Sequence, residues 1–288
     1  MTTVRAEDRG EGVRLLTLDR PPANAITAGL LTDLSVALAA AREDPAVRAV
    51  VLTGEGFFSA GLDLRGGIDF QAASSPGAGT DPFVALRTCL LNFLRFPKPT
   101  VSMLRGHAIA GGLILVLACD YRLGLALDAL EAAKPNPDPL GIRSTRGAPA
   151  PAPALDADYR IGLNEVEIGA SFPKAAFEIV RLRLTHQQAT ELLLGAALYP
   201  ASQAVRLGVV DELLPAGQFE ATAFRRAARL GAFPRDAYAH TKAALVAETV
   251  ARIEAETHDE AMRTAAVWMS PESVAARAAQ QQKLTKGA

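Results

Sequence analysis

The sequence predicts an α/β fold followed by a mainly helical C-terminal region. In the first half of the chain, short apolar runs typical of buried strands alternate with longer segments of helical period. Two glycine-bearing turns occupy equivalent places in two successive repeats of strand, loop and helix. From about Thr185 onward the apolar residues recur almost entirely with a helical period, which predicts a separate helical layer.

The expected elements alternate along the N-terminal part of the chain. The apolar patterns predict strands at 13–18, 49–53 and 100–104, and helices at 27–42, 82–95 and about 110–119. A loop rich in Gly, Phe and Ser follows the second strand, and a low-complexity stretch comes after that loop. The C-terminal pattern predicts one short strand, at 209–213, and helices at 185–195, 200–207, 217–230, 234–250, 255–268 and 271–284.

One segment does not fit this alternation. Between 134 and 156 the chain is rich in Pro and Ala and contains six prolines, which prevent both a packed helix and a strand ladder. We expect an exposed, mobile loop there. Two similar hexapeptides flank it, DYRLGL at 120–125 and DYRIGL at 158–163, and each alternates as a strand does. Two strands of similar environment and a local duplication both explain the likeness, and we expect the two strands to pair or lie close.

Composition excludes several classes of partner. Thirty Lys and Arg against 31 Asp and Glu leave a formal net charge of −1, so we expect neither nucleic acid nor an anionic membrane as a partner. No apolar run reaches 18 residues, and the N-terminus has no signal or transit pattern, which predicts a cytoplasmic protein. The two cysteines and four histidines lack metal-ligand spacing, so we predict neither a metal site nor a disulfide.

Three segments carry residues that are suited to chemistry. The loop at 57–64, FFSAGLDL, can direct the N–H of Leu62 into a pocket, and paired glycines at a helix start leave the N–H of Gly111 free. Each loop alone is most often an ordinary turn, but together they suggest an oxyanion hole. The third segment, 162–169, alternates, so that Glu165 and Glu167 would share one face if it were extended. A lone glutamate is most often solvated.

Five short motifs in this order resemble the crotonase (enoyl-CoA hydratase/isomerase) superfamily along nearly the whole chain. They are FSAGLDL, HAIAGG, ACDYR, GLNEVEIG and LGVVDELLP. The resemblance implies a ββα spiral catalytic core over 1–184, interrupted by the Pro/Ala-rich loop, and a helical region over 185–288 that packs subunits into trimers or hexamers. It also implies an acyl-CoA substrate, with coenzyme A as part of that substrate and no separate cofactor.

The resemblance also implies roles for individual residues. The N–H groups of Leu62 and Gly111 would hold the thioester oxygen, and the carbonyls of Ala60 and Leu62 would receive the adenine amino group. Hydratases of the family use two glutamates, and this chain has Ile114 at the first of these positions and Glu165 at the second.

More weakly, Lys242 and Lys283 are candidates for the CoA phosphates, although a solvated helix face is the default interpretation of both. Asp63 and Asp120 are expected to hold turns and strand ends, and His107 is expected to be structural although it could border the pocket.

The departure at Ile114 distinguishes between activities. Hydration needs a water molecule oriented between two carboxylates, and an isoleucine can neither donate nor accept a hydrogen bond. Shifting a double bond from C3–C4 to C2–C3 needs one carboxylate, and an apolar surround should raise the pKa of Glu165. GLNE before the base and WMSPE at 268–272 also resemble the Δ3,Δ2-enoyl-CoA isomerase branch, which serves the breakdown of unsaturated fatty acids.

Two kinds of alternative to the isomerase remain open. A weak hydratase or a thioester hydrolase would use the same oxyanion hole, because one fold supports many chemistries. A non-catalytic CoA-binding or interaction protein is the alternative from a different class. Retention of Glu165 argues against it, and the insertion shortly before that residue weakens the argument.

Overall fold

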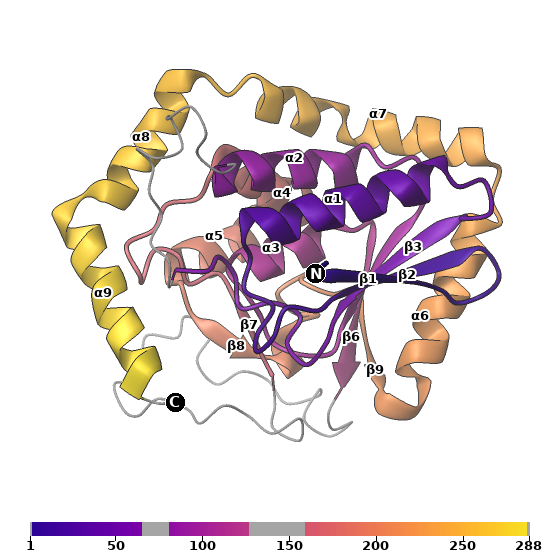
Figure 1. Ribbon diagram of the computed structural model, residues 1–288, viewed down its shortest axis with the longest axis horizontal. Coiled ribbons are helices and arrows are strands. Elements are labelled where there is room, and N and C mark those ends of the chain that lie inside the picture. The colour runs from indigo at the N-terminus through magenta and orange to yellow at the C-terminus, as the bar shows by residue number, and fades with distance from the viewer. Residues whose placement is uncertain (1, 65–80, 127–158, 287–288) are drawn as a thin grey trace.

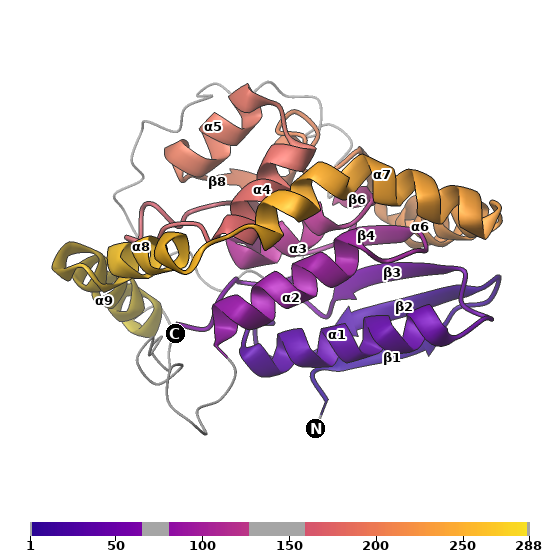
Figure 2. The ribbon, with the colours of Figure 1, turned by 90° about the horizontal axis from the view of Figure 1, so that it is seen from above.

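The core of the protein is a six-stranded sheet with helices on both faces (Figures 1 and 2). The computed structural model describes residues 2–64, 81–126 and 159–286. In these ranges the sheet has the order β1-β2-β3-β4-β6-β9, in which β1 is antiparallel to β2 and all other neighbours are parallel. The strands are β1 Val4–Asp8, β2 Val13–Leu18, β3 Ala49–Gly54, β4 Thr100–Leu104, β6 Tyr121–Ala126 and β9 Glu212–Pro215.

The parallel strands are buried on both faces, which explains why they appear in the sequence as continuous apolar runs. Helix α6, Ala216–Gly231, covers one face, where side chains such as Val51 and Met103 contact it in one cluster. Alternate residues, among them Val50 and Leu52, face the main core on the other side. That side is covered by α1 Ala28–Glu43, α2 Pro82–Leu94, α3 Gly111–Ala118 and α4 Lys174–Arg183.

A small second sheet lies beside the first and brings distant parts of the chain together. Its order is β5-β7-β8, with β5 (Ala108–Ile109) parallel to β7 (Arg160–Gly162) and β8 (Leu198–Pro200) antiparallel to β7. A Cβ atom on Gly162 would lie 2.3 Å from the Ala197 carbonyl oxygen, so glycine is needed for this pairing. The sheet fixes the residues before Gly111 next to those before Glu165.

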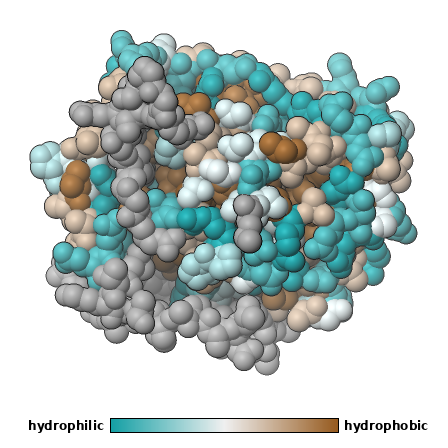
Figure 3. Space-filling model, viewed as in Figure 1, coloured by the Kyte–Doolittle hydropathy of each residue, from teal (hydrophilic) through white to brown (hydrophobic). Residues whose placement is uncertain are grey.

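The C-terminal helices enclose the core from two sides. In Figure 1, α7 runs across the top and α8 and α9 descend along the left edge. Hydrophilic residues dominate the face seen in Figure 3, where apolar residues form small scattered patches. In the described ranges no helix is long and apolar enough to cross a membrane. The remaining elements are α5 His186–Gly195, the 3₁₀ turn η2 Ala201–Gln203, α7 Arg235–Glu254, α8 His258–Met269 and α9 Pro271–Lys286.

Most of the predicted elements lie where the sequence places them, but several short strands and one helix were not predicted. The predicted strands at 13–18, 49–53 and 100–104 and the helices at 27–42, 82–95 and 110–119 are confirmed within one or two residues. The predicted helix at 200–207 is instead the 3₁₀ turn η2, and the strand predicted at 209–213 begins at Glu212. Strands β1, β5 and β8 and helix α4 were not predicted.

The two similar hexapeptides do not pair, contrary to one part of the expectation. Strand β6 belongs to the large sheet and β7 to the small one. Their ends do lie close, because the Tyr159 hydroxyl donates to the carbonyl of Leu125 at 2.9 Å. The loop predicted at 134–156 lies outside the described residues.

Asp120 anchors α7 to the end of the sheet. Its carboxylate accepts hydrogen bonds from the N–H and hydroxyl of Thr100 at 3.0 Å, from Lys242 Nζ at 2.7 Å and from the Tyr238 hydroxyl at 3.2 Å. Arg183 lies 3.6 Å away. Removing one member of such a buried ion pair costs about 3–5 kcal/mol in other proteins. The structural role expected for Asp120 is therefore confirmed.

The same contact overturns both interpretations of Lys242. Its side chain is 6% exposed and paired with Asp120, so it belongs neither to a solvated helix face nor to a surface that receives a phosphate. The side chain of Lys283 lies outside the described part of the structure.

Candidate functional site

Three loops meet at the edge of the small sheet. We call them the first loop (57–64), the second loop (106–111) and the base loop (163–170). Parallel bridges join Ser59 to Ala108 and Ile26 to Leu62. The N–H of Ala110 donates to the Gly162 carbonyl at 2.8 Å, which ties the second loop to the start of the base loop. The three segments that the sequence singles out are therefore brought together.

The backbone of the first loop directs the Leu62 N–H away from its bridge partner. Ile26 N–H donates to the Gly61 carbonyl at 2.7 Å, and Asp63 N–H donates to the Ile26 carbonyl at 2.9 Å. Because successive peptide groups of an extended chain point in opposite directions, the N–H and C=O of Leu62 face the other side. In the described residues nothing accepts from this N–H. It remains available to a ligand.

The Gly111 N–H is the second available donor. Gly111 is the first residue of α3, where an N–H has no acceptor within the helix. The residue before it, Ala110, has a φ of 52° and a ψ of −126°, which an alanine adopts only when its surroundings hold it there. A Cβ atom on Gly111 would lie 3.9 Å from the Leu62 nitrogen, so the two donors are neighbours.

Glycines allow the first and second loops to approach at backbone distance. A Cβ atom on Gly61, whose φ is 83°, would lie 2.8 Å from the Ala110 Cβ and 3.4 Å from the Gly111 nitrogen. One on Gly112 would lie 2.4 Å from the Ser59 carbonyl oxygen. A side chain at either position would force the loops apart, and with them the two N–H groups.

Glu165 is buried without a full set of partners. The residue is 8% exposed, and its Oε2 atom has no hydrogen-bond partner in the described structure. Burial raises the pKa of the Glu165 carboxyl from 4.5 to about 8, opposed in part by a hydrogen bond from its own N–H. The sequence predicts a raised pKa for Glu165 from its apolar surroundings, and burial is the physical cause of the rise. A carboxyl with such a pKa can accept and return a proton near neutral pH.

The base loop is a turn, which corrects the alternating, extended interpretation of this segment. Strand β7 ends at Gly162, and the N–H groups of Ile168 and Ala170 donate back to the Glu165 carbonyl at 3.1 and 2.8 Å. Glu167 is exposed and does not share the environment of Glu165. A left-handed φ of 68° at Gly169 closes the turn.

An apolar cluster lines the base loop. Ile168, Ala170 and Trp268 form a buried cluster against which Leu62, Leu64 and Phe83 pack. The rings of Phe83 and Trp268 meet edge to face, with 5.2 Å between their centroids. The sequence pointed to Trp268 only as part of a helix-start motif, and its place at this site was not predicted.

A second carboxylate is lacking from the described surroundings of Glu165. Ile114 is fully buried in the first turn of α3, three residues after Gly111 and on the same helix face. Glu178 is the other buried glutamate in the described ranges, and it is held by Arg252 at 2.7 Å. Ile114 therefore places a buried apolar side chain, and not a carboxylate, at this position of α3.

Other residues with reactive side chains have structural positions. His107 Nδ1 accepts from the Arg160 N–H at 3.0 Å, and its ring stacks on Phe57 with 4.5 Å between centroids. Asp63 pairs with Arg20 at 2.8 Å, as expected for a residue that holds a turn. Burial raises the pKa of both cysteine thiols to about 12, so neither is a thiolate nucleophile at neutral pH.

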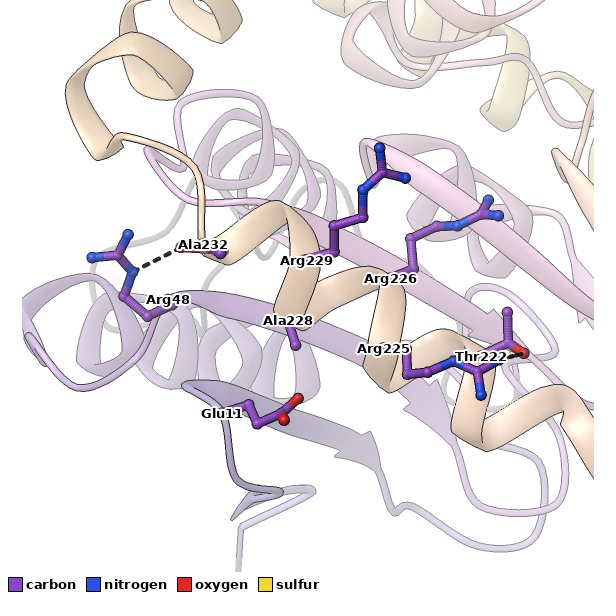
Figure 4. Close-up of a pocket in the computed structure, with 9 residues that line it drawn as sticks. Glu11, Arg48, Thr222, Arg225, Arg226, Ala228, Arg229 and Ala232 are labelled. Atoms are coloured by element: carbon purple, nitrogen blue, oxygen red, sulfur yellow. Dashed lines mark hydrogen bonds between the residues drawn. The ribbon is translucent and has the colours of Figure 1, made fainter.

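A groove of about 710 Å³ lies elsewhere, over α6, and is lined by arginines (Figure 4). The labelled guanidinium groups do not meet at one point, and Glu11 lies on the other side of the helix from Arg226 and Arg229. Arg48 donates to the carbonyls of Gly231 and Phe233, and Arg226 pairs with Glu212. These arginines hold the end of α6 and the sheet, and none of the groove's residues belongs to the three loops.

Comparison with known proteins places the chain among acyl-CoA enzymes. It is 29% identical over 248 residues, 85% of this chain, to the human protein called enoyl-CoA delta isomerase 1, mitochondrial. The match spans 71% of the human enzyme and 66% and 63% of its rat and mouse counterparts. A mouse methylglutaconyl-CoA hydratase is 34% identical over 121 residues, which are 41% of this chain and 37% of that protein.

A solved structure and a family pattern agree with these relatives. The human mitochondrial delta3-delta2-enoyl-CoA isomerase superposes with a TM-score of 0.80 at 26% identity, covering 99% of this chain and 98% of that one. The pattern of the family described as enoyl-CoA hydratase/isomerase matches residues 8–128 and 154–278. With this extent of match, the chain belongs to the enoyl-CoA hydratase/isomerase family of the crotonase superfamily.

Proposed function

We propose that the protein isomerises 3-enoyl-CoA to 2-trans-enoyl-CoA. The observation that carries the proposal is one buried carboxylate, Glu165, on a loop tied to two free backbone N–H groups. An isomerase of this kind moves a single proton between two carbons, so one base suffices. The relatives named as isomerases support this proposal, while the matches named as hydratases, such as the mouse methylglutaconyl-CoA hydratase, make hydration the alternative.

In the first step the Glu165 carboxylate removes a proton from C2. The C2–H bond breaks, its electron pair enters the π system, and negative charge develops on the thioester oxygen of a dienolate. The N–H groups of Leu62 and Gly111 would donate to that oxygen. Loss of one such donor in other enzymes costs about 2.7–4 kcal/mol of transition-state stabilisation, so two donors can lower the enolate substantially.

In the second step the protonated Glu165 returns the proton to C4. The C4–H bond forms, the double bond moves to C2–C3, and the thioester carbonyl is restored, so atoms and charge balance without another reactant. The reaction needs no electron carrier or metal ion, and coenzyme A takes part as the substrate carrier alone. The carbonyls of Ala60 and Leu62, which accept no hydrogen bond from described groups, are our candidates for the adenine amino group.

Hydration is disfavoured by the surroundings of Glu165. A water molecule that adds across C2–C3 must be oriented and deprotonated while a proton reaches C2, which two carboxylates do more readily than one. Ile114 occupies the position where a second would be expected, and the apolar cluster of Ile168, Ala170 and Trp268 offers no polar partner for water. A thioester hydrolase would meet the same obstacle.

Assembly and location stay predictions. We propose trimers or hexamers formed through the C-terminal helices. The support is a group of exposed apolar side chains on α8 and α9, namely Met262, Val267, Met269 and Val274.

The direct test is turnover with Glu165→Gln. Purified protein should convert 3-enoyl-CoA to the 2-trans isomer without added cofactor, and the variant should lose about 10²–10⁴-fold in kcat because it has no general base. CoA binding, measured by calorimetry, should persist. Glu167→Gln is the matched control, since the side chain is exposed two residues away and its loss should change the rate by less than about twofold. Retention of most turnover in Glu165→Gln would contradict the mechanism.

A second prediction concerns Ile114→Glu. The unmodified protein should hydrate crotonyl-CoA about 10²-fold or more slowly than it isomerises, because one acid–base group is missing. The variant should hydrate faster, and its melting temperature should fall because a charge enters an apolar helix. Ile114→Gln is the control, because glutamine has nearly the same shape as glutamate but no carboxylate. This variant should not hydrate crotonyl-CoA faster than the unmodified protein. Fast hydration by the unmodified protein would remove the basis for preferring isomerisation.

A third prediction follows from the pKa of Glu165. Because the carboxylate form removes the proton, kcat/KM should rise about tenfold per pH unit below pH 8 and level off above it. A profile already flat above pH 5 would mean that the free enzyme holds an ordinary, solvated carboxylate.

Stability gives an independent check that needs no substrate. In the folded protein the pKa of Glu165 is about 8, compared with 4.5 for an ordinary glutamate. The folded state therefore binds this proton more tightly than the unfolded state does. The resulting stabilisation is complete below pH 4.5 and is lost as pH rises through 8. Glu165→Gln should therefore become progressively more stable than the unmodified protein over this window, as measured by denaturant unfolding.

A further inference from the structure

The C-terminal helices α8 and α9 contact the base loop directly. Trp268 Nε1 donates to the Ser171 carbonyl at 2.8 Å, just after the loop. A Cβ atom on Gly169 would lie 2.6 Å from the Ser273 Cα, so the turn lies against the first turn of α9 at backbone distance. In Figure 1 these helices form the left edge of the molecule. The loop that carries Glu165 is thus supported by residues about a hundred positions later in the chain.

Arg277 joins the two helices to the loop. One of its guanidinium nitrogens, Nη1, donates to the Gly169 carbonyl at 2.9 Å, and Nη2 donates to the Trp268 carbonyl. The guanidinium lies 5.0 Å from the centre of the Trp268 ring, a cation–π distance. A planar group with donors fixed in a fork suits this double contact better than an ammonium does.

The peptide group that Arg277 contacts at Gly169 is hydrogen-bonded to the backbone of Glu165. The Gly169 carbonyl and the Ala170 N–H are the two ends of one peptide group, and this N–H donates to the Glu165 carbonyl at 2.8 Å. A cation on the carbonyl end polarises the peptide and strengthens the hydrogen bond at its N–H end. Arg277 is therefore linked through a single peptide group to the residue that carries the base.

We propose that Arg277 is a positioning residue that holds the base loop, and with it the Glu165 carboxylate, against the two N–H donors. The expected effect of Arg277 on turnover rests on the proposed function. Its role in holding the base loop rests on the contacts described above. Arg277 is not a catalytic residue, because its described contacts are backbone carbonyls and the Trp268 ring.

Arg277 acts through geometry rather than through charge on the base. The pKa of Glu165 is raised by burial and lowered by its own N–H, and in the described part of the chain no charged side chain contributes. Two charged side chains on the elements that pack here, Glu167 on the loop and Glu272 at the start of α9, are both exposed. Release of the loop would admit water to Glu165 and lower its pKa toward 4.5.

The test compares Arg277→Ala with Arg277→Lys and with Arg263→Ala. Arg263 is the matched control, because it is an exposed arginine on α8 with no hydrogen bond or ion pair in the described structure. Two readouts are used on the full chain. One is kcat and KM for 3-enoyl-CoA, and the other is the titration of the Glu165 carboxyl, followed by ¹³C NMR with carboxyl-labelled glutamate and assigned with Glu165→Gln.

We expect Arg277→Ala to lower kcat about 10- to 100-fold, the scale of a misplaced group, while KM changes little. The midpoint of Glu165 should fall from about 8 by about one unit or more. Arg277→Lys keeps a cation that can donate but loses the planar fork, so it should recover part of both, and Arg263→Ala should match the unmodified protein.

A folded Arg277→Ala with unchanged kcat and an unchanged midpoint would overturn the proposal, as would equal losses in Arg263→Ala. If Arg277→Ala does not fold, Arg277→Lys decides, since an unaltered midpoint and kcat there would also overturn it. Absence of isomerase turnover in the unmodified protein would contradict the proposed function, and the NMR midpoint would still decide whether Arg277 holds the loop.

Discussion

The backbone contact between the first and second loops is the constraint on which the site depends. Gly61 lies against Ala110 and Gly112 lies against Ser59, at distances that leave no room for a Cβ atom. This contact holds the peptide planes of Leu62 and Gly111 so that both N–H groups stay free and adjacent. Ala110 adopts a left-handed φ to complete the turn, and local strain of this kind persists where the surrounding structure enforces it.

The burial of Glu165 opposes stability and favours reactivity. Glu165 is 8% exposed and one of its carboxyl oxygens has no described partner, so ionising this group costs free energy. The raised pKa reflects that cost. Near neutral pH the same shift makes the group a better match for a proton that must be taken up and returned. The surrounding structure must offset the cost, and Asp120 with its four partners is one interaction that does so at a distance from the site.

Long elements and the glycine turns could be predicted from the sequence because their signals are local. The strands of the parallel sheet are apolar on both faces, and the order of the glycine motifs in the sequence indicates two free N–H groups. Strands β5 and β8 were missed since two or three residues show no period, and β1 was missed since it is a charged edge strand. The base loop alternates like a strand, yet Gly169 and its contact with Ser273 make it a turn.

Interactions between residues far apart in the chain could not be predicted from the sequence. The sequence around Lys242 is typical of an exposed helix face. The side chain is nevertheless buried, because it pairs with Asp120, 122 positions earlier in the chain. Arg277 lies in a helix with few apolar residues, and its role follows from a contact 108 positions away. In both cases the side chain's partner, rather than its neighbours in sequence, decides what it does.

The central claim is that one sheltered carboxyl group carries the proton from C2 to C4. The most direct measurement follows deuterium in a 3-enoyl-CoA that carries two deuterium atoms at C2 and is converted in ordinary water. A buried Glu165 with no partner at Oε2 exchanges slowly with solvent, so a substantial share of the 2-trans product should carry deuterium at C4, detected by NMR. Product with hydrogen alone at C4, even in the first turnover, would contradict the account, because the proton would then come from solvent or from a second acid.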